Sequence, residues 1–240
     1  MLPVVKIMKG EQMLGSVYSY FNHPLYLLAI FITFLMSLFI TMSFHEFAHA
    51  HAALKEGDVT AKVLGRYTLA PFAHIDVTGL VFLLLFGIGF AKPVPVDSRN
   101  FKRGVRSQLR VAFAGVLVNI LIGVVACFLY AFLVNVWSAL FNNYGFVSML
   151  YETFFSFLIS LNFMFAFFNI LPIYPLDGFR VVEALSKTEN GYIRFMRRYS
   201  FWIILILLIT DLLGLYINFF AYGLADLVLT GFDKLFALMV

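Results

Sequence analysis

Residues Leu25 to His49 read LYLLAIFITFLMSLFITMSFHEFAH, an apolar run that ends in a His-Glu-x-x-His motif. A span of about 20 apolar residues is enough to cross the hydrocarbon core of a bilayer. Ionisable side chains are costly at that depth and therefore require an explanation. Helical residues four apart share a face, so His45 and His49 could bind one zinc ion together. Glu46 lies beside them, where it could act on a water molecule at that metal.

Two other interpretations of this motif are weighed against the metal site. A soluble zinc enzyme fits poorly, because the residues before the motif are as apolar as lipid. In a purely structural interpretation, the two histidines and the glutamate make hydrogen bonds inside a helix bundle and bind no metal. The spacing and the identity of Glu46 favour the metal site over both.

The composition is that of a polytopic membrane protein. The chain has 240 residues, of which 62% are hydrophobic and 12% charged; a soluble domain has about twice that share of charge. The net charge of +4 comes from basic residues between apolar segments, where they set topology, and does not indicate nucleic-acid binding. Cys127 is the one cysteine and allows no internal disulfide. We expect a single membrane domain over residues 1–240.

The hydropathy pattern predicts an all-α polytopic fold with about four transmembrane helices. A turn is expected at Asn142–Gly145, and a C-terminal apolar segment, Leu224–Val240, is expected to lie at the interface or to return only partway. The predicted helices are Leu25–Leu54, Val111–Phe141, Phe146–Ile170 and Phe201–Tyr222, the last interrupted by Asp211.

The segment after the first helix has a different pattern. Val59–Gly79 is rich in Thr, Val and Gly, which predicts a small β-hairpin or re-entrant structure. Leu80–Ala91 is apolar but short for a span, which suits a re-entrant segment. Lys92-Pro93-Val94-Pro95-Val96 then breaks any helix.

Two basic segments, Asp97–Arg110 and Arg180–Arg198, belong on the cytoplasmic side by the positive-inside rule. The first helix then ends inside, and the N-terminus lies outside. This topology places His45, His49 and Asp177 at a similar depth near the cytoplasmic face.

A catalytic zinc ion needs three protein ligands and an open position, and Asp177 is the leading candidate for the third. Pro172 and Pro175 end the preceding helix, and Gly178 permits a sharp turn. The alternative interpretation of Asp177 is a simple helix-stop turn at the interface. Glu183, Asp76 and His74 remain open as the third ligand, whereas Glu152 follows the turn on the far side and should be too distant.

These motifs together resemble the site-2 protease family of intramembrane zinc metalloproteases, in the compact branch without PDZ or CBS domains. The resemblance runs from about Leu25 to Gly178, with Ala70 as a departure where the branch often has Asn. The residues that carry it are His45-Glu46-x-x-His49, Gly65–Leu69, Pro71, His74–Asp76, Gly79, Ala91–Val96, Gly115-x-x-x-Asn119 and Asn169-x-x-Pro172-x-x-x-x-Asp177-Gly178.

The resemblance implies zinc bound by His45, His49 and Asp177, with Glu46 as general base and later proton donor. It implies that Asn169 contacts the substrate or the oxyanion and that Asn119 holds the substrate backbone. It implies a catalytic core at residues 25–178, followed by a C-terminal membrane segment at 199–240. The expected substrate is a membrane protein with a transmembrane helix, cut in or beside the bilayer of a bacterial inner membrane.

Two further classes remain as alternatives. A metal- or proton-handling transporter could use the same His and Asp side chains, although no inverted repeat is visible. An inactive scaffold could keep the fold, although the complete motif argues against that. The sequence names neither the substrate nor the oligomeric state.

Overall fold

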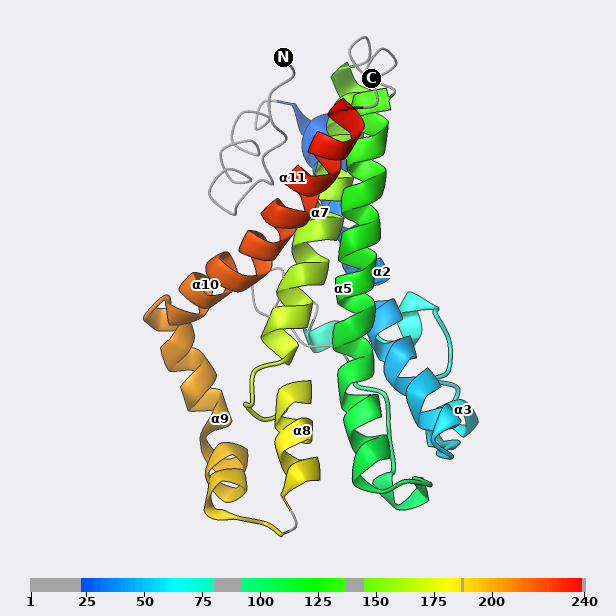
Figure 1. The fold of residues 1–240 in the computed structure, drawn as a ribbon, viewed down its shortest axis with the longest axis vertical. Helices are drawn as coiled ribbons and strands as arrows, with labels where there is room; N and C mark the ends of the chain where they lie inside the picture. The colour runs from blue at the N-terminus through cyan, green and yellow to red at the C-terminus, as the bar shows by residue number, and fades with distance from the viewer. Residues whose placement is uncertain (1–22, 80–91, 137–144, 187, 239–240) are drawn as a thin grey trace. The chain divides into compact units, whose positions relative to one another are not determined.

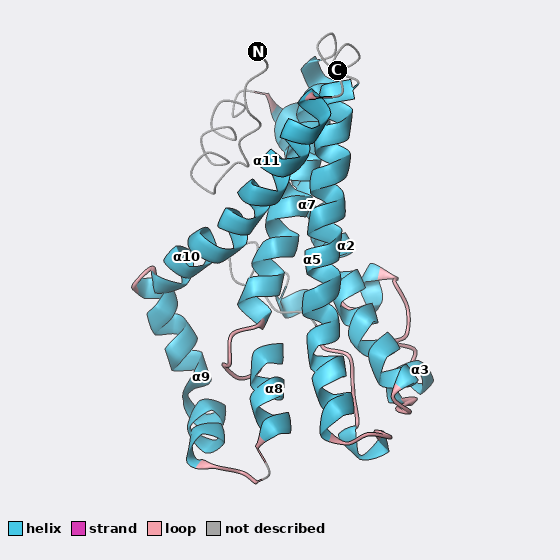
Figure 2. Ribbon diagram, in the orientation of Figure 1, coloured by secondary structure: helices cyan, strands magenta, loops and turns pink. Residues whose placement is uncertain are grey.

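The computed structural model of the chain describes residues 23–79, 92–136, 145–186 and 188–238. Within these ranges every regular element is a helix, and loops connect the helices (Figure 2). The longer ones, labelled in Figure 1, are α2 (Pro24–Lys55), α5 (Val105–Val136), α7 (Gly145–Asn169), α8 (Asp177–Leu185), α9 (Gly191–Ile209) and α11 (Gly223–Ala237). Between α9 and α11 lie α10 (Leu212–Ile217) and the π-helical turn η3 (Asn218–Tyr222).

Four helical stretches are long and apolar enough to cross a membrane: Pro24–Lys55, Val105–Asn135, Gly145–Asn169 and Leu212–Ala237. A helix satisfies its backbone hydrogen bonds internally, which lipid cannot do for it. The chain is therefore an all-α polytopic membrane protein, as the composition predicts.

The chain divides into two compact units. Unit 1 comprises residues 1–41, 120–165 and 214–240, and unit 2 comprises residues 42–119 and 166–213. The expected partition into a core at 25–178 and a C-terminal segment at 199–240 stays a prediction.

Unit 1 is held by polar contacts between α2 and α7 and by aromatic contacts between α5 and α11. Thr33 donates to Thr153, and Asn162 donates to Thr41 at 2.8 Å. Phe128 of α5 packs against Phe232 and Phe236 of α11. Lipid offers no hydrophobic driving force between helices, so these packing and polar contacts hold the unit together.

Unit 2 contains the end of α2, the start of α5, and α8 and α9. An extended segment, residues 92–97, runs along α2 and anchors there through a buried cluster of Ala50, Ala61 and Val94. The short helices α3 (Thr60–Val63), η1 (Pro71–Ala73) and η2 (Ser98–Asn100) lie in the same unit. This packing keeps the backbone of residue 94 beside the motif helix.

Of the two alternatives predicted for Val59–Gly79, the β-hairpin is wrong. Residues Thr60–Val63 form α3, and no strand occurs among the described residues. Asp58 accepts hydrogen bonds from both the amide and the hydroxyl of Thr60, which starts a helical turn. Such local side-chain bonds outweigh the β preference of Val and Thr. The predicted re-entrant segment Leu80–Ala91 and the predicted turn at residues 142–144 lie outside the described residues.

The prediction of a final span over Phe201–Tyr222 is also wrong. The predicted interruption at Asp211 is confirmed, because helix α9 ends at Ile209 and Asp211 has a φ of 57°, in the left-handed region. That conformation breaks a helix, so the apolar stretch that can span is Leu212–Ala237. The C-terminal segment, expected to return only partway, is part of this span. Helix α5 begins at Val105, inside the basic segment. The sequence had predicted that it begins at Val111.

Candidate metal centre

Three side chains of unit 2 converge on one point. The Nε2 atoms of His45 and His49 lie 3.1 Å apart. Oδ2 of Asp177 lies 3.2 Å from Nε2 of His45 and 3.0 Å from Nε2 of His49. All three residues are buried. Zinc bonds of about 2 Å in a tetrahedral site set ligand atoms about 3.3 Å apart, close to this spacing.

The tautomer of His49 fits a metal at this point. Its Nδ1 lies 2.7 Å from the carbonyl oxygen of Val111. A carbonyl only accepts, so Nδ1 carries the proton and Nε2 presents a lone pair. That lone pair faces a carboxylate oxygen and a second imidazole nitrogen, an arrangement that a cation stabilises. Among the described residues, this is the one group of three His, Cys, Asp or Glu side chains that could hold a metal ion.

Gly115 of α5 makes room for the two imidazoles. A Cβ atom at this position would lie 2.5 Å from Cε1 of His45 and 2.5 Å from Nε2 of His49. Real Cβ atoms do not approach other atoms that closely, so any side chain here would displace the rings. The glycine of the Gly-x-x-x-Asn motif is therefore part of the site.

Asp177 is delivered by the turn between α7 and α8. It occupies the first turn of α8, and Gly178 packs so closely that a Cβ would lie 2.1 Å from the Ile170 carbonyl oxygen. The carboxylate oxygen Oδ2 of Asp177 faces Nε2 of both imidazoles, and a carboxyl group that binds a metal must be deprotonated.

Glu46 is held next to the cluster by the extended segment. Its Oε2 accepts a hydrogen bond of 2.8 Å from the Val94 amide, the one described group that donates to this carboxylate. Glu46 is buried and interacts electrostatically with His49. This single anchor fixes the carboxylate and leaves Oε1 to take up a proton.

The two asparagines lie outside this cluster. Asn119 is fully buried one helical turn beyond Gly115, and its amide nitrogen and oxygen have no hydrogen-bond partner among the described residues. Asn169 is half-buried at the end of α7. The competing third ligands are engaged elsewhere: Glu183 pairs with Arg197, His74 with the Thr68 carbonyl, and Asp76 with the Gly79 amide. The cluster does not include Glu152.

Sequence reasoning missed the two backbone groups that orient the site, the Val94 amide and the Val111 carbonyl. A partial signal exists for the first. Pro93 and Pro95 have no N–H and favour extended backbone, which leaves Val94 as the donor between them. Every residue carries a carbonyl, so nothing in the sequence marks Val111.

The chain is similar to known zinc metalloproteases. The model of Peptidase family M50 matches residues 33–210. YwhC of Bacillus subtilis (strain 168), which carries the name of a zinc metalloprotease, is 35% identical over 74% of this chain and 80% of its own length. The zinc metalloprotease MJ0392 of Methanocaldococcus jannaschii is 27% identical over 73% of this chain and 40% of its own length. No solved structure matches the chain significantly.

The family match covers the motif helix, the extended segment that anchors Glu46 and the turn that carries Asp177. On that ground, the chain belongs to Peptidase family M50, the family of the site-2 proteases.

Proposed function

We propose that this chain is a zinc endopeptidase that hydrolyses peptide bonds within or next to transmembrane helices of other membrane proteins. The observation that supports this most is the convergence of His45, His49 and Asp177 within 3.2 Å. The two histidines lie on α2, a helix apolar enough to span. His45, His49 and Asp177 would hold the ion. When bound, zinc supplies Lewis-acid polarisation of a carbonyl and acidification of a water molecule.

The residues around the ion have distinct roles in this proposal. Glu46, anchored at Oε2 by Val94, would accept the water's proton at Oε1 and later deliver it to the leaving amine. Asn119 presents a buried amide without a partner among the described residues, which suits a hydrogen bond to the substrate backbone. Asn169, at the end of α7, would contact the substrate or the oxyanion.

Water reaches such a site over a short path. His45 and His49 lie 10 and 6 residues before the end of α2 at Lys55, which is about 15 and 9 Å at 1.5 Å per residue. The basic segments that follow α2 and α8 place that end on the cytoplasmic side by the positive-inside rule. We therefore propose cleavage near the cytoplasmic face of a bacterial cell membrane, as in regulated intramembrane proteolysis.

The test is cleavage of a panel of membrane-embedded single-span peptides by purified protein in detergent, with zinc measured in each sample. Wild type should cut, and Glu46→Gln should retain zinc while its rate falls at least about 100-fold, because proton transfer is lost. A transporter that uses the same side chains would need no Glu46 and would show no cleavage. Zinc bound by both proteins with no cut peptide would overturn the protease proposal in favour of transport or a scaffold.

A further inference from the structure

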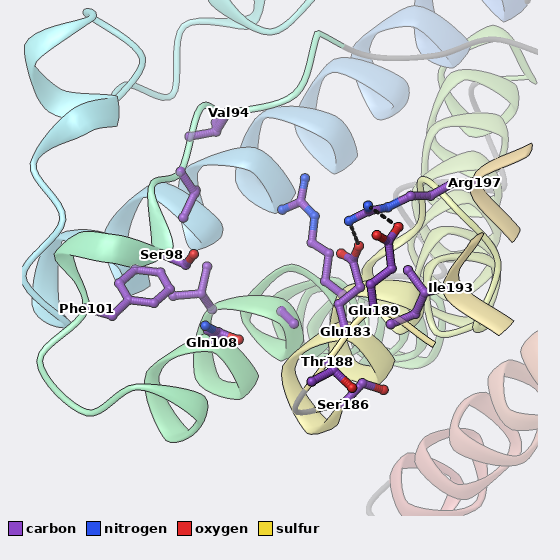
Figure 3. A pocket seen from close by; sticks show the side chains of 14 residues that line it. Val94, Ser98, Phe101, Gln108, Glu183, Ser186, Thr188, Glu189, Ile193 and Arg197 are labelled. Carbon is purple, nitrogen blue, oxygen red and sulfur yellow. Dashed lines mark hydrogen bonds and ion pairs between the residues drawn. The ribbon is translucent and has the colours of Figure 1, made fainter. Parts of the chain in front are cut away.

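Unit 2 contains a cavity of about 490 Å³ next to the metal centre. Val94 and Val111 line it, and the same two residues hold Glu46 and His49 through their backbone groups. The cavity, whose lining side chains are drawn in Figure 3, therefore shares two of its residues with the backbone contacts of Glu46 and His49.

The two sides of the cavity differ in chemistry. The side formed by residues 94–112 is mainly apolar, with Val96, Phe101 and Ala112. The opposite side, formed by α8, the loop after it and α9, is polar and charged. An apolar wall facing a polar one suits an extended peptide, which has side chains of both kinds and a polar backbone.

The two arginines that line the cavity differ in how closely they are paired with carboxylates. Arg197 binds both acids of the polar side, Glu183 at 2.6 Å and Glu189 at 3.1 Å, as the dashed lines in Figure 3 show. The other cation of the lining is Arg180. Its nearest carboxylate oxygen among the described residues is Oδ1 of Asp177, at 3.9 Å. No described group accepts a hydrogen bond from this guanidinium, which is about one-third exposed (37%).

We propose that this cavity is a substrate subsite in which Arg180 binds a carboxylate of the peptide. A guanidinium binds a carboxylate through two parallel hydrogen bonds, and an Arg without a close acceptor is poised to do so. Arg180 lies three residues after Asp177 on α8, which is about 5 Å along the helix axis. The bound carboxylate therefore belongs close to the bond that is cut.

This inference rests on the proposed peptidase function and specifies which substrate groups the site prefers. Two sources share the chemistry: an acidic side chain near the scissile bond, and the α-carboxylate that cleavage releases. The first would make Arg180 a specificity residue, and the second would make it a product-binding residue. A binding experiment separates them without requiring turnover.

The experiment uses the full-length Glu46→Gln protein with zinc, in detergent, and four fluorescent ten-residue peptides of Ala and Leu. They carry a central Glu or Gln and end in a free carboxylate or an amide. In at least one of the two comparisons, central Glu against Gln or free against amidated C-terminus, the peptide with the carboxylate should bind at least about tenfold more tightly. That is the size expected of a charge-assisted pair. Adding Arg180→Gln should abolish that preference, and Arg180→Lys should keep part of it. The central-residue pair reports a side-chain site, and the terminal pair reports a product site.

The matched control is Arg194→Gln, an exposed arginine of α9 that does not line the cavity. It should keep the full preference, and zinc content and melting temperature should show that every variant folds. Equal binding of all four peptides, absence of binding, or a preference that survives Arg180→Gln would overturn the subsite. If wild type cuts no membrane substrate, the peptidase proposal fails, while the acid-to-amide comparison still decides whether Arg180 binds carboxylates.

Discussion

Gly115 shows how the absence of a side chain shapes the metal centre. The two imidazoles lie where its Cβ would be, 2.5 Å away in both cases. Because α5 supplies this space and the Val111 carbonyl supplies the acceptor for Nδ1 of His49, the helix orients the rings without contributing a ligand. Loss of such outer contacts typically weakens metal binding by about 10- to 100-fold.

Replacement of Gly115 tests that role. We expect Gly115→Ala to weaken zinc binding about tenfold to hundredfold, because the methyl group displaces the rings. Competition of the purified protein with a fluorescent zinc chelator measures the affinity. Gly231→Ala is the control, since a Cβ there meets open space. Equal affinity of both variants and wild type would mean that the rings are not fixed by α5.

The metal-ligand residues were predicted from the sequence mainly through the spacing of the histidines and the turn-forming residues around Asp177. The four-residue repeat of His45 and His49 places both on one helix face. The prolines and the glycine around Asp177 indicate an irregular backbone at membrane depth. A carboxylate is costly there and indicates a functional site. The orienting groups, Val94 and Val111, act through the backbone, which is chemically the same in every residue. Arg180 was assigned only to a basic segment that sets topology, because its availability for a ligand depends on Arg197 neutralising the nearby acids.

At the scale of elements, Asp58 joins the end of α2 to the segment that carries Val94. Its buried carboxylate accepts hydrogen bonds from the amide and hydroxyl of Thr60, the amide of Asp97 and the side-chain amide of Asn100. Burial raises the pKa of Asp58, but these donors outweigh burial and lower it below its ordinary value. The ionised carboxylate therefore stabilises the folded state.

Asp58→Asn should lower the free energy of unfolding by about 1–3 kcal/mol, because an NH₂ group then faces buried donors. The sign of the pH effect follows from the lowered pKa. The stabilisation is present above the unfolded pKa of about 4 and is lost as pH falls through the lower folded value. The variant should thus lose less stability than wild type below about pH 4. Thermal melts across pH measure both effects, and Asp97→Asn, in an exposed ion pair with Arg99, should change little. A variant as stable as wild type would contradict the role of Asp58.

The sequence predicted the long uninterrupted helices well. A long apolar run in lipid can satisfy its own backbone hydrogen bonds only by forming a helix. Val59–Leu69 misled the prediction because its β-branched residues are overridden by the hydrogen bonds that Asp58 makes locally. The last span misled it because residues on both sides of Asp211 are apolar. The sequence predicted an interruption at Asp211, but not that the left-handed backbone there would end the helix and move the span to Leu212–Ala237.

For the whole molecule, the positions of the breaks and the basic segments together predict a topology. The positive-inside rule predicts that the ends of α2 and α7 lie inside, so we expect Arg194 and Asp211 on the cytoplasmic side and Leu212–Ala237 to cross to the outside. Leu238 is then expected outside. This differs from a span over residues 201–222, which would place Asp211 inside the membrane.

Single-cysteine labelling distinguishes the two topologies in a Cys127→Ala background. With a membrane-impermeant maleimide, Leu238→Cys should label in intact cells, whereas Lys102→Cys, Arg194→Cys and Asp211→Cys should label only after permeabilisation. The four native residues are all exposed, so access depends on the side of the membrane. Protection of Asp211→Cys even after permeabilisation would contradict the span at Leu212–Ala237.

The measurement that tests the metal centre most directly is zinc K-edge X-ray absorption on the purified protein, beside Asp177→Asn, with zinc counted per chain. We expect one zinc ion in wild type, bound by two imidazole nitrogens and a carboxylate oxygen at about 2.0–2.2 Å. The Asp177→Asn protein should show a weaker site without the carboxylate. Absence of zinc in wild type, or a ligand set that Asp177→Asn leaves unchanged, would contradict the assignment of His45, His49 and Asp177 as its ligands.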